Sequence, residues 1–113
     1  MTRYLISFDD GAMTFPEEDF PSVAKAAHAV MYEAKAAGAW VTGAGLKDHA
    51  EASLVAVDGA ITEGPPAGKK NHLGGFSILE VPSREEALRW AAKFAVACRC
   101  AQEVREIMHD PEL

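Results

Sequence analysis

The sequence predicts an α+β fold in which two helices cover one face of an antiparallel sheet. Apolar residues recur at helical spacing in segments 19–38 and 83–94, and short runs with strand-like composition flank both segments. An Asp-Gly pair at positions 58 and 59, between two further short runs, indicates a hairpin. A chain of 113 residues can bury a core of its own, so we expect residues 1–113 to form one domain.

In the first half, residues 4–8 form the predicted first strand. Asp9 and Asp10 follow it as ordinary turn residues, with a paired acid/base set as the alternative interpretation. The first helix begins after Asp19, a plausible N-cap, and ends at Gly38, which suits the position after a helix.

The middle of the chain holds a short strand at 39–43, where Gly43 and Gly45 suggest a bulge or bend. Segments 52–57 and 60–63 then form a hairpin, for which we expect a type I′ turn.

After a loop at 64–74, residues 75–81 form a strand. Ser83 and Glu86 make a capping box that begins the second helix. Residues 102–108 form a last strand whose charges suggest a sheet edge.

The resulting order of strand, helix, strand, hairpin, strand, helix and strand is the ferredoxin-like plan. Helices then cover one face of the sheet and leave the other bare. We expect apolar residues such as Phe8, Trp40 and Ile78 to point to the bare face. An exposed apolar face of this kind favours a homodimer in which two sheets stack.

Composition excludes several classes of protein. With 17 acidic and 11 basic residues the net charge is −6, which disfavours binding to nucleic acid or to an anionic membrane surface. No run is long enough for a secretory signal or a membrane span, so we expect a cytoplasmic protein.

Cys98 and Cys100 should be reduced, and their role is open. Zinc would need two further ligands, so no metal is expected, and no nucleotide-binding fingerprint or other sign of a cofactor is present.

Several segments resemble the DGPF branch of the YCII-related proteins. They read EGPPA at 63–67, LGGF at 73–76, EALRWA at 86–91 and EVR at 103–105, and Gly38 to Leu46 is similar as well. The resemblance implies a dimeric α+β barrel, in which two ferredoxin-like subunits enclose a cleft.

The chain departs from the family at several positions. Glu63 replaces an aspartate and Pro66 a phenylalanine. Shorter YCII proteins carry a helical histidine and a later aspartate, proposed as an acid/base pair. This chain has Ala27 with His28 beside it at the first position, and Phe94 and Ala95 at the second, so that pair is not visibly retained.

Three residues are candidates for acid/base catalysis. Glu63 can place a carboxylate at a pocket rim, or it can satisfy backbone amides in a turn. His72 precedes a glycine pair that lets backbone approach a ligand, although it can equally be an ordinary polar residue. His28 can border a pocket, or it can be a solvent-facing imidazole.

Four further residues are candidates for substrate binding. Gly74 and Gly75 offer close backbone approach. Lys70 and Arg105 can hold a negative charge, with surface solvation and an ion pair to a neighbouring glutamate as the respective alternatives.

Together these features favour a homodimer that binds a small, anionic metabolite in a cleft near residues 63–76. As an enzyme it would be a lyase or isomerase without a cofactor, as the resemblance implies. The alternative is a binding or oligomerisation module without catalysis.

Overall fold

The computed structural model describes residues 1–113. It contains two helices, six strands and two short 3₁₀ turns, at Glu17–Asp19 and His49–Glu51. The helices and strands are, in chain order, β1 (Thr2–Asp9), α1 (Phe20–Ala36), β2 (Trp40–Gly45), β3 (Ser53–Val55), β4 (Ile61–Glu63), β5 (Leu73–Val81), α2 (Arg84–Cys98) and β6 (Glu103–Glu106). Neither α1 nor α2 has the length and apolar character that spanning a membrane requires.

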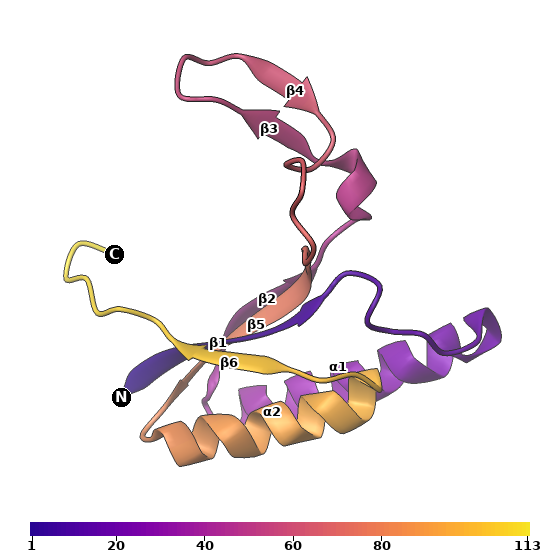
Figure 1. Ribbon diagram of the computed structural model, residues 1–113. Coiled ribbons are helices and arrows are strands. Elements are labelled where there is room, and N and C mark those ends of the chain that lie inside the picture. Colours follow the sequence, from indigo (N-terminus) through magenta and orange to yellow (C-terminus); the bar gives the residue numbers. More distant parts are fainter.

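Four strands form an antiparallel sheet in the order β2-β5-β1-β6. Both helices lie against the same face of this sheet (Figure 1). This arrangement confirms the predicted α+β, ferredoxin-like fold. The last strand also lies at an edge of the sheet, as its charges indicated.

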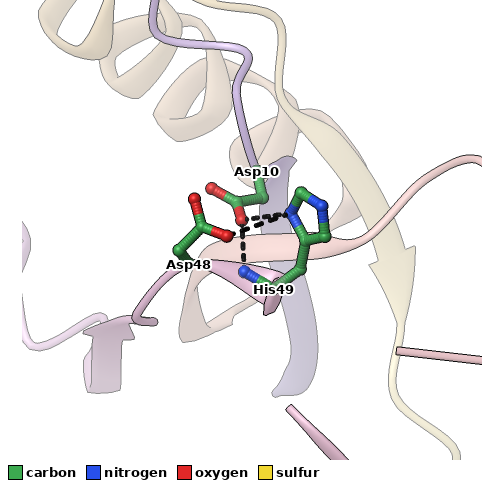
Figure 2. A group of neighbouring side chains, drawn as sticks. All are labelled: Asp10, Asp48 and His49. Carbon is green, nitrogen blue, oxygen red and sulfur yellow. Dashed lines mark hydrogen bonds and ion pairs between the residues drawn. The ribbon is translucent and has the colours of Figure 1, made fainter. Parts of the chain in front are cut away.

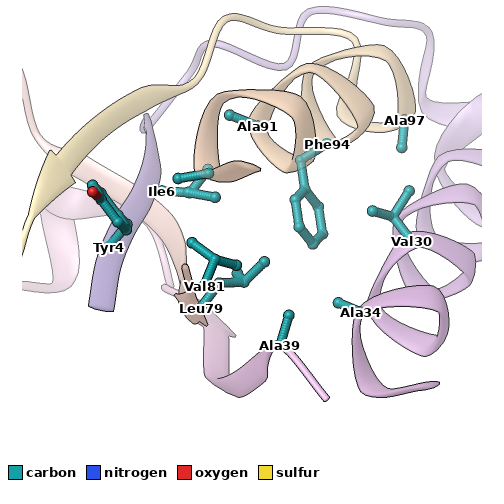
Figure 3. Packing of buried hydrophobic residues seen from close by; sticks show 11 residues of the cluster. Tyr4, Ile6, Val30, Ala34, Ala39, Leu79, Val81, Ala91, Phe94 and Ala97 are labelled. Carbon is teal, nitrogen blue, oxygen red and sulfur yellow. The ribbon is translucent and has the colours of Figure 1, made fainter. Parts of the chain in front are cut away.

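The core lies between the sheet and the helices (Figure 3). From the sheet, Ile6, Leu79 and Val81 are almost completely buried. The helices contribute mostly small residues to the core, such as Ala34 and Ala91, together with the ring of Phe94. Small side chains on the facing helices let the backbones approach each other and the sheet closely, while the aliphatic strand residues supply most of the buried volume.

The helix ends follow local sequence signals in most places. The Ser83 hydroxyl accepts a hydrogen bond from the Glu86 backbone N–H at 3.2 Å, which confirms the Ser83 half of the predicted capping box of α2. The Glu86 carboxylate accepts from Arg89 instead. Gly38 follows α1 with a φ of 73°, as expected. Asp19, however, makes no capping hydrogen bond. Its carboxylate instead accepts from Arg99 at 2.9 Å, so a tertiary ion pair replaces the local cap.

Strands β3 and β4 form a separate hairpin that projects away from the sheet and helices (Figure 1). The hairpin prediction is confirmed, but the predicted type I′ turn is wrong. That turn needs positive φ at both central residues, whereas only Gly59 has one here, at 87°. The Gly59 N–H donates to the Ala56 carbonyl at 2.9 Å, so the tight turn is centred on Val57 and Asp58, and Gly59 follows it.

The predicted composition of the bare face needs a correction. Phe8 and Trp40 lie on the side of the sheet that faces the helices. There the Trp40 ring packs against the Phe94 ring, with 6.3 Å between the ring centroids. A register shift between Trp40 and Thr42 changes which residues of β2 face which way. The bulge therefore precedes Gly43 and Gly45, the glycines to which the sequence assigned it. Ile78 does lie on the uncovered face, opposite Leu5 of β1.

Candidate acid/base site

Three chain segments meet at one end of the sheet. Because β1 and β2 both run antiparallel to β5, their carboxyl ends flank the amino end of β5. The Asp10 N–H donates to the His72 carbonyl at 2.7 Å, and the Leu46 N–H donates to the Gly74 carbonyl at 2.9 Å. Residues that follow β1 and β2 are thereby brought beside the loop that precedes β5.

At this junction Asp10 holds His49 by two hydrogen bonds (Figure 2). One Asp10 oxygen, Oδ2, lies 2.8 Å from both the backbone nitrogen and the Nδ1 atom of His49. A second carboxylate oxygen, of Asp48, lies 3.7 Å from the same Nδ1 and accepts from the Ala50 N–H at 2.8 Å. The paired contacts from Asp10 fix the orientation of the imidazole ring.

The protonation of this pair follows from its hydrogen bonds. The imidazole of His49, and then its backbone N–H, lower the pKa of Asp10 below the usual value of 3.8. Asp10 is therefore a carboxylate at neutral pH and can only accept a hydrogen bond. The proton of a neutral His49 then resides on Nδ1, which leaves Nε2 as a base. The His49 side chain as a whole is 43% exposed.

His72, predicted as a catalytic candidate, stacks on the ring of His49. The two ring centroids lie 4.4 Å apart with only 4° between the planes. Both residues line a cleft of about 390 Å³ between the segment after β2 and the loop before β5. Its other lining residues are Leu46, Lys47, Asp48, Glu51, Ala52, Pro65, Pro66, Lys69 and Leu73.

The two glycines predicted to bind substrate lie in close contact with β1. A Cβ atom on Gly74 would lie 2.7 Å from the Asp10 nitrogen, and one on Gly75 would lie 2.5 Å from the Phe8 ring. Their missing side chains thus let β5 approach the strand that carries Asp10. This packing positions the acid/base pair.

The remaining predicted residues lie apart from this pair. Glu63 accepts a hydrogen bond from the Ser53 hydroxyl at 3.0 Å within the hairpin, and it does not line the cleft. Lys70 is exposed, and its neighbour Lys69 is the one that lines the cleft. Arg105 lies on β6, opposite Leu5. Of the three predicted catalytic residues, the structure therefore brings only His72 beside Asp10 and His49.

His28 borders a different cavity, of about 270 Å³, between the helices and the sheet. No lining residue is shared with the cleft. The cavity is lined mainly by apolar residues: Ile6, Phe8, Met13, Phe15, Phe20, Val23, Ala24, Ala27, His28, Met31, Trp40, Gly43, Ala44, Gly45, Phe76, Ser77, Phe94, Cys98 and Gln102.

Sequence reasoning missed Asp10 and His49 as a pair. Asp10 is predicted as a turn residue, with an acid/base pairing with Asp9 as the alternative, and His49 is not among the predicted site residues. One available signal was the strand order, because a ferredoxin-like sheet places the segments after its first two strands on either side of the strand that separates them. Polar residues follow both β1 and β2, and His72 precedes β5, the strand between them. These polar residues were therefore candidates for one site.

The same atoms offer ligand types that a metal ion accepts, since oxygens of Asp10 and Asp48 and a nitrogen of His49 lie within 4.8 Å of one another. A protonated Nδ1, however, cannot also ligate a metal. Elsewhere, burial raises the pKa of both Cys98 and Cys100. Neutral thiols are poor metal ligands at neutral pH. The geometry fits proton transfer better than metal binding.

Comparisons with known proteins agree with this fold. The family model of the YCII-related domain matches residues 16–109. A search of curated proteins finds no match. One similar solved structure is 5-chloro-2-hydroxyhydroquinone dehydrochlorinase (TftG) from Burkholderia phenoliruptrix AC1100, in complex with 2,5-dihydroxybenzoquinone. It is 18% identical, with a TM-score of 0.54 over 97% of each chain. Because the family model covers most of the chain, this protein belongs to the YCII-related family.

Proposed function

We propose that this protein is a cofactor-free lyase or isomerase that moves a proton with His49, oriented by Asp10. The observation that carries the proposal is the contact of 2.8 Å between the Asp10 carboxylate and His49 Nδ1. A carboxylate in this position stabilises the imidazolium that forms when Nε2 takes a proton. His72 gives the site a second imidazole at stacking distance.

In the proposed reaction, Nε2 of His49 removes a proton from a carbon next to a carbonyl group of the substrate. The electron pair of the C–H bond moves toward the carbonyl oxygen and gives an enolate. The enolate then either expels a leaving group from the neighbouring carbon, as in a lyase, or takes the proton back at another carbon, as in an isomerase. In the isomerase reaction the His49 imidazolium returns its proton to the new carbon. In the lyase reaction His49 releases its proton to solvent, and His72 is the proposed donor to a leaving group that needs a proton.

The lining of the cleft supports a small anionic substrate. Lys69 and Lys47 both line it, and an ammonium group stabilises an enolate or a carboxylate. The fold also occurs in a dehydrochlorinase, an enzyme that removes HCl from its substrate. Such an elimination requires a base but no redox cofactor, and the keto tautomer of a substituted hydroquinone has a C–H bond next to a carbonyl group. Substituted hydroquinones are therefore the first compounds to test.

The proposal is tested by ultraviolet spectroscopy with chlorinated hydroxyhydroquinones as substrates. We expect His49→Gln to lower the turnover number by about 10² to 10⁴, the usual contribution of a general base. His109→Gln changes a histidine of the C-terminal tail and should leave turnover unchanged. Nitrogen-15 NMR of the wild type should show the His49 proton on Nδ1. A proton on Nε2, or full turnover by His49→Gln, would contradict the proposal.

We also propose that the protein is a homodimer. Leu5 and Ile78 share the uncovered sheet face, since they lie opposite each other in the pairing of β1 with β5. Burying this apolar face between two copies removes it from water.

The second candidate function is an oligomerisation module without catalysis. The projecting hairpin favours it, because Val55, Val57 and Ile61 are at least 63% exposed there. In that case His49→Gln should behave as the wild type in every assay, while deleting residues 54–62 should reduce the assembly size measured by analytical ultracentrifugation.

A further inference from the structure

We infer that two symmetry-related ion pairs hold the proposed homodimer together, each between Arg105 of one subunit and Glu103 of the partner subunit. The uncovered sheet face then fits one kind of partner, a second copy of this chain. The inference rests on the proposed homodimer and names the charged residues that select the partner. It does not depend on the proposed acid/base chemistry.

Both residues lie on the uncovered face, in the edge strand β6. Arg105 lies opposite Leu5 in the pairing of β6 with β1, and opposite residues of an antiparallel pair project to the same face. Side chains alternate along a strand, so Glu103 projects to this face as well. Val104, between them, packs against the core on the other face. Arg105 and Glu103 therefore share the face that carries Leu5 and Ile78.

Neither charge has a partner within the chain. Arg105 and Glu103 are both exposed, and no ion pair of the structure includes either of them. The ion pair between Arg105 and a neighbouring glutamate, one interpretation of the sequence, thus does not form in a single subunit. Arg3, on the same face of β1, is by contrast paired with Glu80 of β5 at 2.9 Å. One arginine of this face is satisfied inside the chain, and the other is left for a partner.

The surroundings of the two residues carry both signs of charge in equal number. Arg105 and Glu103 line one hollow together with Lys69 and Asp9, so two positive and two negative side chains meet there. A partner whose surface carries a single sign would set like charges against two of them. A second copy presents both signs. Two-fold symmetry repeats each contact, so one Arg105–Glu103 contact between subunits implies a second.

Burial of the face makes this pairing necessary. A second sheet stacked on Leu5 and Ile78 removes water from the neighbouring charges of β6. A charge that loses water without gaining a partner is costly, whereas a guanidinium binds a carboxylate through two parallel hydrogen bonds. Charged contacts also disfavour partners with a different charge pattern. The apolar residues thus promote association, and Arg105 and Glu103 select the partner.

Charge reversal tests the pairing directly. Arg105→Glu and Glu103→Arg each place like charges at both contacts, so either variant alone should dissociate about 100-fold more readily than the wild type. In an equimolar mixture of the two variants each contact again joins opposite charges, so heterodimers should form. Sedimentation equilibrium measures the dissociation constants, and native mass spectrometry identifies the heterodimer by its mass.

Arg84→Glu is the matched control. Arg84 is exposed at the start of α2, on the opposite side of the sheet (Figure 1), and no ion pair includes it. It makes the same change of charge as Arg105→Glu, so a variant that remains dimeric shows that the net charge alone does not dissociate the dimer.

Neutral variants separate a direct pair from a general effect of charge, and they also serve if a reversed variant fails to fold. Arg105→Gln and Glu103→Gln should each weaken the dimer. The double variant should be no weaker than the weaker single variant, because both changes remove the same ion pair. Effects of the two single changes that multiply in the double variant would overturn the inference.

The outcomes distinguish this inference from the proposals on which the protein's function depends. A dimeric wild type whose reversed variants stay dimeric alone, or form no heterodimer when mixed, would overturn the ion pairs and leave the homodimer standing. A monomeric wild type would overturn both. The turnover number of His49→Gln tests the catalytic proposal separately.

Discussion

The Asp10 N–H donates to the His72 carbonyl at 2.7 Å, and this bond joins the two sides of the candidate site. Asp10 follows β1, whereas His72 precedes β5. The same Asp10 residue uses its carboxylate to hold His49. A single residue thus connects the segments that follow β1 and β2 with the loop before β5.

Gly74→Ala should disturb this junction. The new Cβ would lie 2.7 Å from the Asp10 nitrogen and 2.8 Å from its Cα, both of them backbone atoms that cannot rotate away. We expect a loss of about 1 to 3 kcal/mol in the free energy of unfolding, typical of overpacking. Urea unfolding measures it. Gly45→Ala is the control, since its Cβ would meet nothing within 4 Å. Equal stability of the two variants would contradict the close packing of β5 on β1.

The Asp10 carboxylate should stabilise the fold in a pH-dependent way. Hydrogen bonds from the His49 imidazole and backbone N–H lower the pKa of Asp10 in the folded protein. A carboxyl group with a lowered folded pKa contributes stability above its unfolded pKa of 3.8, and that contribution is lost as the pH falls through the folded value.

Asp10→Asn removes this contribution. The wild type should therefore exceed Asp10→Asn in stability near neutral pH, and the difference should shrink as the pH falls below about 4. Thermal unfolding of both proteins from pH 7 to pH 3 measures it. Asp58→Asn, in the exposed hairpin turn, is the control. A stability difference that grows toward low pH would show that Asp10 has no lowered pKa.

Local signals in the sequence predicted the elements of the fold well. The cap of α2 depends on Ser83 and Glu86, which are three residues apart, so its prediction needed no knowledge of tertiary structure. The hairpin was predicted from the neighbouring residues Asp58 and Gly59 in the same way. The type of its turn was predicted wrongly.

The candidate site was less predictable because its contacts are long-range. Asp10 and His49 are 39 residues apart and meet only through the pairing of β1, β5 and β2. Asp19 failed as a cap for a related reason, since Arg99, 80 residues away, binds its carboxylate. Sequence patterns indicate which residues are polar, and the strand register decides which of them meet.

Leu79→Ala should be among the most damaging single changes. Leu79 is completely buried, at 0% exposure, and lies opposite Tyr4 in the sheet. Removing a buried leucine leaves a cavity and typically costs about 2 to 5 kcal/mol. Leu88→Ala, at a position of α2 that is 43% exposed, is the control and should cost much less. Chemical unfolding measures both, and equal losses would contradict the assignment of Leu79 to the core.

Ile78→Glu should dissociate the proposed dimer. Ile78 lies on the uncovered sheet face, between Leu5 of β1 and Thr42 of β2. A carboxylate at the centre of two stacked sheets would lose its water without gaining a partner, which is costly. Sedimentation equilibrium at micromolar concentration should therefore give a dimer for the wild type and a folded monomer for Ile78→Glu.

Val96→Glu provides the matched control, because Val96 is 81% exposed on α2, on the opposite side of the sheet. It should remain dimeric, since a carboxylate there stays in water. If the wild type itself sediments as a 12.1 kDa particle, the uncovered face does not hold a second copy. The acid/base cleft, whose Asp10–His49 pair forms within one chain, would then have to act in the monomer.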